Sequence, residues 1–246
     1  MSRSSRQKFI RIWHRRLGPI VGIQLLLWSL GGLYFSWVHL TLVRSETDMA
    51  IIDPPDLKQA RYTADIQSII ANSRLTHLEA ISLASLLGDP VYRLVQDDAH
   101  AELYHAVTGE RLSPISEATA IALAEADFAP AVPVLNALLV EEVSPGEEYR
   151  GPLPAWRVNF DNWKKSALYV SANEGWVVSR RSTIWRAFDF LWMLHIMDYK
   201  ERDNFNNWLI RIVSLLGVVT VFSGYYLFYL TSSIGRPSRK KSPARS

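Results

Sequence analysis

Three histidines lie beside or within long apolar stretches, where a polar ring needs a chemical reason. His195 lies in the run FLWMLHIMDY (190–199), His14 lies in RIWHRRLG, and His39 lies in SWVHL. A histidine ring binds metal ions through either of its two nitrogens. The chain has no cysteine, which excludes disulfides, thiolate metal sites, iron–sulfur clusters and cysteine nucleophiles. A bound redox cofactor must therefore be held by histidine, methionine or noncovalent contacts.

The segment 182–199 places His195 on one aromatic face of a predicted helix. The residues of that face recur at spacings of three or four: Trp185, Phe188, Trp192, His195 and Tyr199. Aromatic and apolar neighbours around a histidine are typical of an axial ligand of haem iron. An interfacial helix whose histidine lies among lipid headgroups explains the same pattern. Met193 and Met197 point to a different face of the helix and rank below His195 as ligands.

Two apolar segments are long enough to cross a membrane, which needs about 20 apolar residues. We expect transmembrane helices over 17–42 and 208–230 rather than buried core helices. The tails 1–16 and 231–246 carry only basic charges, while all acidic residues lie within 46–207. Because basic tails stay in the cytoplasm, both termini are expected there, and the tails are topology signals rather than nucleic-acid arms. The long first apolar core favours an uncleaved anchor over a cleaved signal peptide.

The membrane segments contribute three further candidate residues. On one continuous helix, His14 and His39 would lie roughly 37 Å apart on the same side, too far to bind one iron. His39 and His195 are both expected at the outer surface, where they would hold a haem iron within one chain or between two. Arg211, in the first turn of the second span, either snorkels to the interface or pairs with a haem propionate. Small residues spaced along the first span admit a flat cofactor or another helix: Gly18, Gly22 and Gly32.

The central segment 46–181 reads as two similar halves. Each half has a helical stretch, 63–73 or 116–128, followed by strand-like stretches that end in a glycine-containing turn. We expect an α+β domain with two copies of a helix plus a three-stranded antiparallel unit, followed by an interfacial amphipathic helix over 182–200. The histidines of this segment lie in polar settings, as surface or turn residues do: His77, His100 and His105. The segment contains no hydrolase or phosphate-binding motif.

The order of these motifs resembles a known family. HRRLGPIVGIQLLLWSLGGLYFS is similar to the first span of the PepSY-associated transmembrane family. VYRLV…LYHAVTGERLS and AWRVNFD…LYVSANEGWVVSRR resemble PepSY units, and TIWRAFDFLWMLHIMDY…DNFNNWLIR resembles the lead-in to that family's later span. The resemblance implies a bacterial inner-membrane protein tied to iron acquisition, in a group that includes haem-dependent reductases of ferric iron or ferric siderophores. His14 and His195 fall on the family's recurrent histidines.

The residues and the resemblance together predict a b-type haem protein that passes electrons from quinol or another donor to periplasmic ferric iron or ferric siderophore. The expected haem-binding residues are His195 and His39 as iron ligands, then His14 and Arg211. Longer members hold two haems, whereas this chain has no histidine at the cytoplasmic end of its second span. Either only an outer haem exists, or two chains of a homodimer each supply His14. The alternative is a non-enzymatic accessory subunit that binds a transporter or peptidase.

Overall fold

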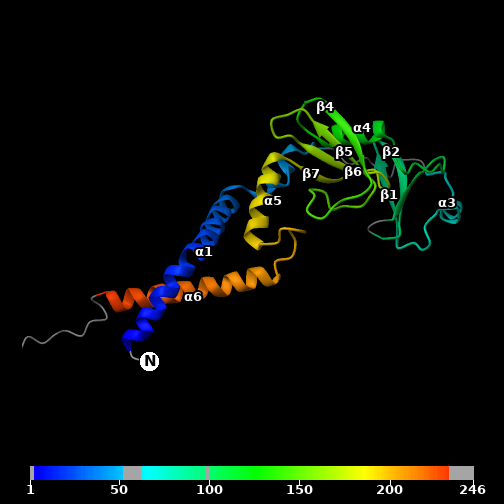
Figure 1. Cartoon of the computed structure of the whole chain (residues 1–246). Helices are drawn as coiled ribbons and strands as arrows, with labels where there is room; N and C mark the ends of the chain where they lie inside the picture. Colours follow the sequence, from blue (N-terminus) through cyan, green and yellow to red (C-terminus); the bar gives the residue numbers. More distant parts are fainter. Residues whose placement is uncertain (1–2, 52–61, 98–99, 233–246) are drawn as a thin grey trace, which may run out of the picture. The chain divides into compact units, whose positions relative to one another are not determined.

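The computed structural model describes residues 3–51, 62–97 and 100–232, and the chain divides into two units. The helical unit comprises residues 1–36 and 190–246, and the sheet unit comprises residues 37–189. The basic residues 236–245 of the expected cytoplasmic tail lie outside the described residues. The architecture is α+β, with a long apolar helix near each end of the chain and two antiparallel sheets between them, as predicted (Figure 1).

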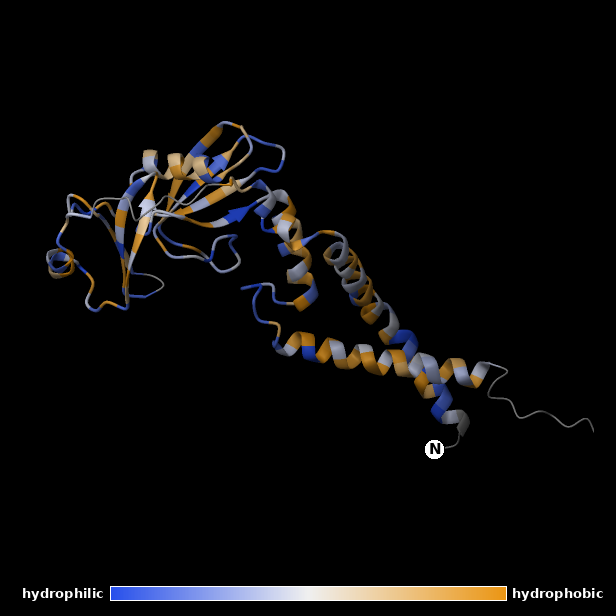
Figure 2. Ribbon diagram, turned by 180° about the vertical axis from the view of Figure 1, so that it is seen from behind, coloured by the Kyte–Doolittle hydropathy of each residue, from blue (hydrophilic) through white to orange (hydrophobic). Residues whose placement is uncertain are grey.

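The long helices are α1 (Arg3–Trp37) and α6 (Trp208–Thr231). Figure 2 shows hydrophobic residues around both helices. Only 17% of the most apolar window of α1 and 11% of that of α6 are buried within the structure. Their apolar side chains therefore face outward, which suits a lipid environment and not a soluble core. The side chain of Asn207 caps α6 by accepting a hydrogen bond from the Ile210 N–H at 3.0 Å.

The first long helix ends earlier than its apolar run. α1 stops at Trp37, and His39 has an extended backbone as the N-cap of the four-residue helix α2 (Leu40–Val43). The prediction that one continuous helix carries both His14 and His39 was therefore wrong. The carbonyl of His39 accepts hydrogen bonds from the N–H groups of Leu42 and Val43 at the start of α2. A 3₁₀ turn, η1 (Glu46–Asp48), follows.

The first half of the sheet unit contains α3 (Ile66–Asn72) and the strands β1 (Ala80–Leu86), β2 (Asp89–Val95) and β3 (Ala101–His105). The strands pair antiparallel in the order β1-β2-β3. Ile69 of α3 packs against Leu94 and Tyr104, and all three are buried. After β3 the chain turns through Gly109 and returns only as far as an isolated bridge between Tyr104 and Arg111.

The second half contains α4 (Glu117–Asp127) and the strands β4 (Val134–Val140), β5 (Ala155–Phe160), β6 (Ala167–Ser171) and β7 (Val177–Arg181). These strands pair antiparallel in sequence order. The expected three-stranded unit was therefore wrong for this half, which has a fourth strand. The turn residue Gly175 has a φ of +66°, so the β6–β7 segment closes into a full hairpin.

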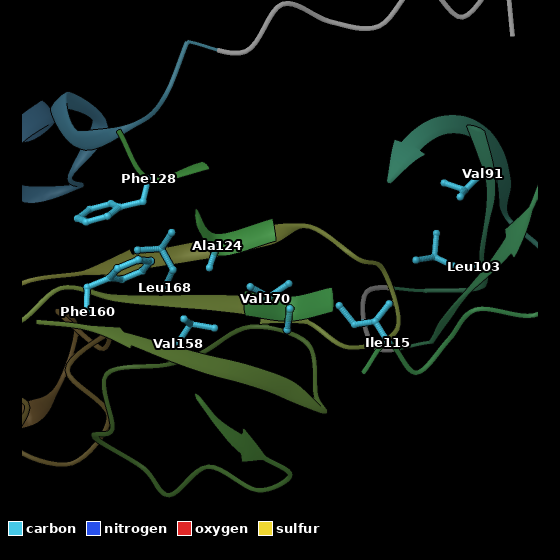
Figure 3. Packing of buried hydrophobic residues seen from close by; sticks show 10 residues of the cluster. Val91, Leu103, Ile115, Ala124, Phe128, Val158, Phe160, Leu168 and Val170 are labelled. Carbon is cyan, nitrogen blue, oxygen red and sulfur yellow. The ribbon is translucent and has the colours of Figure 1, made fainter. Parts of the chain in front are cut away.

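The two halves share one hydrophobic core. Small residues of α4, Ala120 and Ala124, are fully buried and let the helix approach the strands closely. Figure 3 shows the core residues, which come from both sheets and from the segment between them: Val91, Leu103, Ile115, Phe128, Val158, Phe160, Leu168 and Val170. A Cβ added to Gly175 would lie 2.7 Å from the side chains of Leu86 and Leu103. This turn of the second sheet is therefore packed directly on the first sheet.

An ionic hub joins the loop after β4 to the start of α5 (Thr183–Ile196). The Glu148 carboxylate accepts hydrogen bonds from Arg186 at 2.7 and 3.2 Å and from the Tyr169 hydroxyl at 2.9 Å, and it pairs with Arg157 at 2.9 Å. Burial raises the pKa of Glu148, but these hydrogen bonds and charges outweigh burial and hold that pKa below its ordinary value. Glu148 therefore stabilises the folded sheet unit in its ionised form.

Replacing the carboxylate tests the contribution of this hub. We expect Glu148→Gln to lower the free energy of unfolding by about 2 kcal/mol near neutral pH, because charge-assisted hydrogen bonds to two arginines are lost. The depressed pKa stabilises the fold above the unfolded-state pKa, and that stability disappears as pH falls through the folded-state pKa. The difference in the free energy of unfolding between the wild type and the variant should therefore decrease at acidic pH. Unfolding of the detergent-purified chain at several pH values measures the loss of stability and its pH dependence. Glu147→Gln, at an exposed neighbouring position, is the matched control.

Candidate functional site

The candidate site lies at the C-terminal end of α5, where its last carbonyl groups are bound by the other helices of the helical unit. Gln24 Nε2 donates to the Leu194 carbonyl at 3.2 Å, and Trp28 Nε1 donates to the His195 carbonyl at 2.8 Å. The side-chain amide of Asn207 donates to the Ile196 carbonyl at 2.9 Å. The final carbonyls of a helix have no partner within it. These three donors therefore fix the end of α5, and with it the backbone of His195.

Three aromatic rings surround the imidazole of His195. The ring centroids of Phe35, Trp28 and Trp192 lie 5.9, 6.0 and 6.2 Å from that of His195. The Trp192 ring is almost parallel to the imidazole, and the Phe35 ring meets it edge-on. The Nδ1 atom of His195 is buried and has no hydrogen-bond partner among the residues the structure describes. A buried polar atom of this kind costs free energy unless another group completes it.

A glycine on α1 makes this close approach possible. A Cβ added to Gly31 would lie 3.6 Å from the Phe35 ring and 3.9 Å from both His195 Nδ1 and the Leu191 carbonyl. A methyl group just fits there, whereas a longer side chain would push α5 away. Within the chain nothing lies within 4 Å of a Cβ at Gly32, so the close approach of a cofactor or another helix there stays a prediction. Gly18 and Gly22 face similarly open space.

His14 is held at the other end of the helical unit. Its Nδ1 lies 2.7 Å from Ser223 Oγ, and the Ser223 hydroxyl donates its only proton to the Thr220 carbonyl. Ser223 must then accept from His14, so the ring donates this hydrogen bond through Nδ1. A Cβ added to Gly224 would lie 3.1 Å from His14 Cε1, so this glycine lets α6 pack against the ring.

The other predicted residues are separated from these two. His14 and the Gly31 level of α1, where His195 packs, are about 25 Å apart along the helix, so His14 and His195 cannot bind the same iron. His39 is exposed and belongs to the sheet unit, and its pairing with His195 stays a prediction. Arg211 is exposed near the start of α6, without an ion pair among the described residues.

The histidines of the sheet unit include two turn residues, as expected. His100 Nδ1 lies 2.8 Å from the Asp97 carboxylate, and His105 Nδ1 accepts the N–H groups of Val107 and Thr108. Within the described part of the chain, no group of three or more histidine, aspartate or glutamate residues is arranged to hold a metal ion.

Sequence reasoning missed the residues that position His195 and His14. Gln24 was the available signal, because it is a lone amide inside an uncharged apolar span and is 92% buried. Ser223 and Gly224 gave no signal, since serine and glycine are common in membrane helices and their partner on α1 depends on helix register.

Adjacent glycines provide a matched test of the α1–α5 contact. We expect Gly31→Leu to lower the free energy of unfolding by about 1–3 kcal/mol, because the added side chain overpacks the space beside His195. Gly32→Leu should change it little, since that position is open. Thermal unfolding of detergent-purified protein, followed by tryptophan fluorescence, measures the difference. Equal effects of the two substitutions would contradict the packing described at Gly31.

Comparison with known proteins identifies the family of this chain. A search of curated proteins and a search of solved structures each gave no match. The family model for the PepSY-associated TM region matches residues 1–232. This match takes in both long apolar helices, the two sheets between them and the helix that carries His195. The chain is thus a membrane protein that belongs to the PepSY-associated TM family.

Proposed function

We propose that the protein is an inner-membrane b-type haem protein that transfers electrons to ferric iron or a ferric siderophore in the periplasm, for iron acquisition. One observation carries the proposal: the imidazole of His195 is enclosed by aromatic rings while its buried Nδ1 lacks a hydrogen-bond partner among the described residues. The aromatic enclosure suits an imidazole that binds haem. Iron would bind through Nε2, because Nδ1 is buried and lies 3.9 Å from a Cβ at Gly31.

The residues around His195 fit a haem ligand. In this proposal His195 and His39, from the same chain or a partner, would hold the haem iron. Haem would supply reversible one-electron chemistry, and two histidine ligands favour electron transfer over oxygen chemistry. Trp28 donates to the His195 carbonyl and fixes the backbone of the ligand residue. Phe35 and Trp192 pack beside the imidazole ring.

His14 and Arg211 have secondary roles in the proposal. His14 donates to Ser223 through Nδ1, so Nε2 is the nitrogen that would bind a metal. His14 therefore suits a second haem shared by two chains, or a donor-side position near a quinol. Arg211 has no ion pair among the described residues, so its guanidinium is available for a haem propionate.

A homodimer is the assembly that the helical unit favours. Two chains would form a bundle of four membrane helices, the number from which many haem pockets are built. Gly18, Gly22 and Gly32 face open space on α1, and small residues at this spacing let membrane helices approach closely. The basic tails support an orientation with both termini in the cytoplasm, in which the sheet unit lies in the periplasm with the iron substrate.

Substitution of single histidines tests the proposal. We expect purified His195→Ala to lose most of its haem, measured by the pyridine haemochrome assay, because no other residue takes its place in the aromatic pocket. His105→Ala, which alters a turn histidine of the sheet unit, should keep the wild-type haem content. His39→Ala should convert any remaining haem to a form that binds carbon monoxide, since one axial position becomes free.

A His195→Ala variant that keeps the wild-type haem content would overturn the ligand assignment. A wild-type protein without haem and with a normal fold would favour the accessory-subunit alternative. The wild-type stoichiometry then distinguishes the assemblies. About one haem per chain fits a His39–His195 site in each protomer, whereas one per two chains fits a site at the dimer interface.

A further inference from the structure

The strand β4 leaves an unpaired apolar edge on the four-stranded sheet. β4 pairs only with β5 and is the terminal strand (Figure 1). Among the described residues, no backbone hydrogen bond reaches its outer side. Leu135, Leu138 and Leu139 are 66%, 52% and 45% exposed. Proteins normally protect such an edge with charges, proline or a covering segment, because it pairs readily with another strand.

Two other edge strands, β7 and β1, expose fewer large apolar side chains than β4 does. β7, at the opposite edge of the same sheet, ends in Arg180 and Arg181, both engaged in hydrogen bonds. β1, an edge of the first sheet, exposes one large apolar residue, Ile81, at 37%. The exposed apolar side chains are therefore concentrated on β4, which indicates a docking surface rather than an average strand edge.

The charges at the two ends of β4 are complementary to each other. The exposed residues Glu141 and Glu142 directly follow the strand. Near its beginning, Lys165 is exposed and has no ion pair among the described residues, and it lines a cavity of about 590 Å³ together with Leu135. A second copy of the same strand, running antiparallel, would place its acidic end beside this lysine. The same contact would recur at the other end of the pair.

We propose that β4 pairs antiparallel with β4 of a second copy of this chain, about a twofold axis near Leu138, to form one continuous sheet across the dimer. The register places Glu142 of each copy opposite Val134 of the other. Leu138 lies beside Arg157 on the sheet face opposite α4, because Leu138 pairs with Arg157 and the neighbouring pair Ala137–Val158 faces the core. That face also carries the cavity lined by Arg157 and Lys165.

A single pair of strands buries little of the area that a stable dimer needs. The edge contact therefore acts together with the membrane helices, and in that sense the inference rests on the homodimer of the proposed function. It does not depend on haem. The interface is isologous, so each residue of one copy meets its symmetry-related counterpart.

The cysteine-free chain allows a direct test by disulfide cross-linking in native membranes. Residues on the axis of an antiparallel pair have Cα atoms about 4.5–5.5 Å apart, which a disulfide can span. We expect Leu138→Cys to give at least about tenfold more covalent dimer than Ile81→Cys, the exposed position on the other edge strand.

Cross-linking of Leu138→Cys no greater than that of Ile81→Cys would overturn the proposal. Adducts with a different protein in place of the covalent dimer would also overturn it and would assign the edge to another partner. Haem content, measured on the same membranes, separates the two proposals. A haem-free dimer would contradict only the function, and a haem-containing protein without the cross-link would contradict only this interface.

Discussion

The helical unit depends on the last carbonyl groups of α5 finding hydrogen-bond donors. In apolar surroundings an unpaired carbonyl has no water to replace its partner and costs several kcal/mol. Gln24 and Trp28 of α1 and Asn207 before α6 bind three consecutive carbonyls. The pairing of these carbonyls thereby joins α1 and the segment before α6 to the end of α5. His195, the candidate metal ligand, lies at this junction.

The two histidines of the helical unit have different environments. The ring of His14 donates a hydrogen bond to the Ser223 hydroxyl, which donates to the Thr220 carbonyl. The Nδ1 atom of His14 therefore has its hydrogen-bond partner within the chain. His195 has three aromatic neighbours and a buried Nδ1 without a partner among the described residues. The hydrogen bonds to the last carbonyl groups of α5 fix the backbone of His195. They do not involve its imidazole ring. A fixed backbone and an aromatic enclosure support the haem proposal more strongly at His195 than at His14.

Much of the fold could be predicted because periodicity and composition act locally. The apolar runs predicted both long helices, and alternating strands with glycine turns predicted two antiparallel sheets. The end of α1 at Trp37 could not be predicted, since the apolar run continues to Val43 without proline or glycine. Gly31 and Gly32 differ in sequence position by one residue but in direction by about 100°, so only the packing of α5 distinguishes them. Gln24 and Trp28 meet partners 170 and 167 residues away, beyond the reach of any local pattern.

The most direct test of the central claim is an absorption spectrum of the wild-type protein, purified in detergent from cells with ample haem, before and after dithionite. The account predicts a Soret band that shifts and sharpens on reduction, with a sharp α band typical of b-type haem with two histidine ligands. The oxidised form should also give a low-spin ferric signal in electron paramagnetic resonance. A folded, colourless protein would contradict the account, and His195 would then be a packed residue of a membrane anchor.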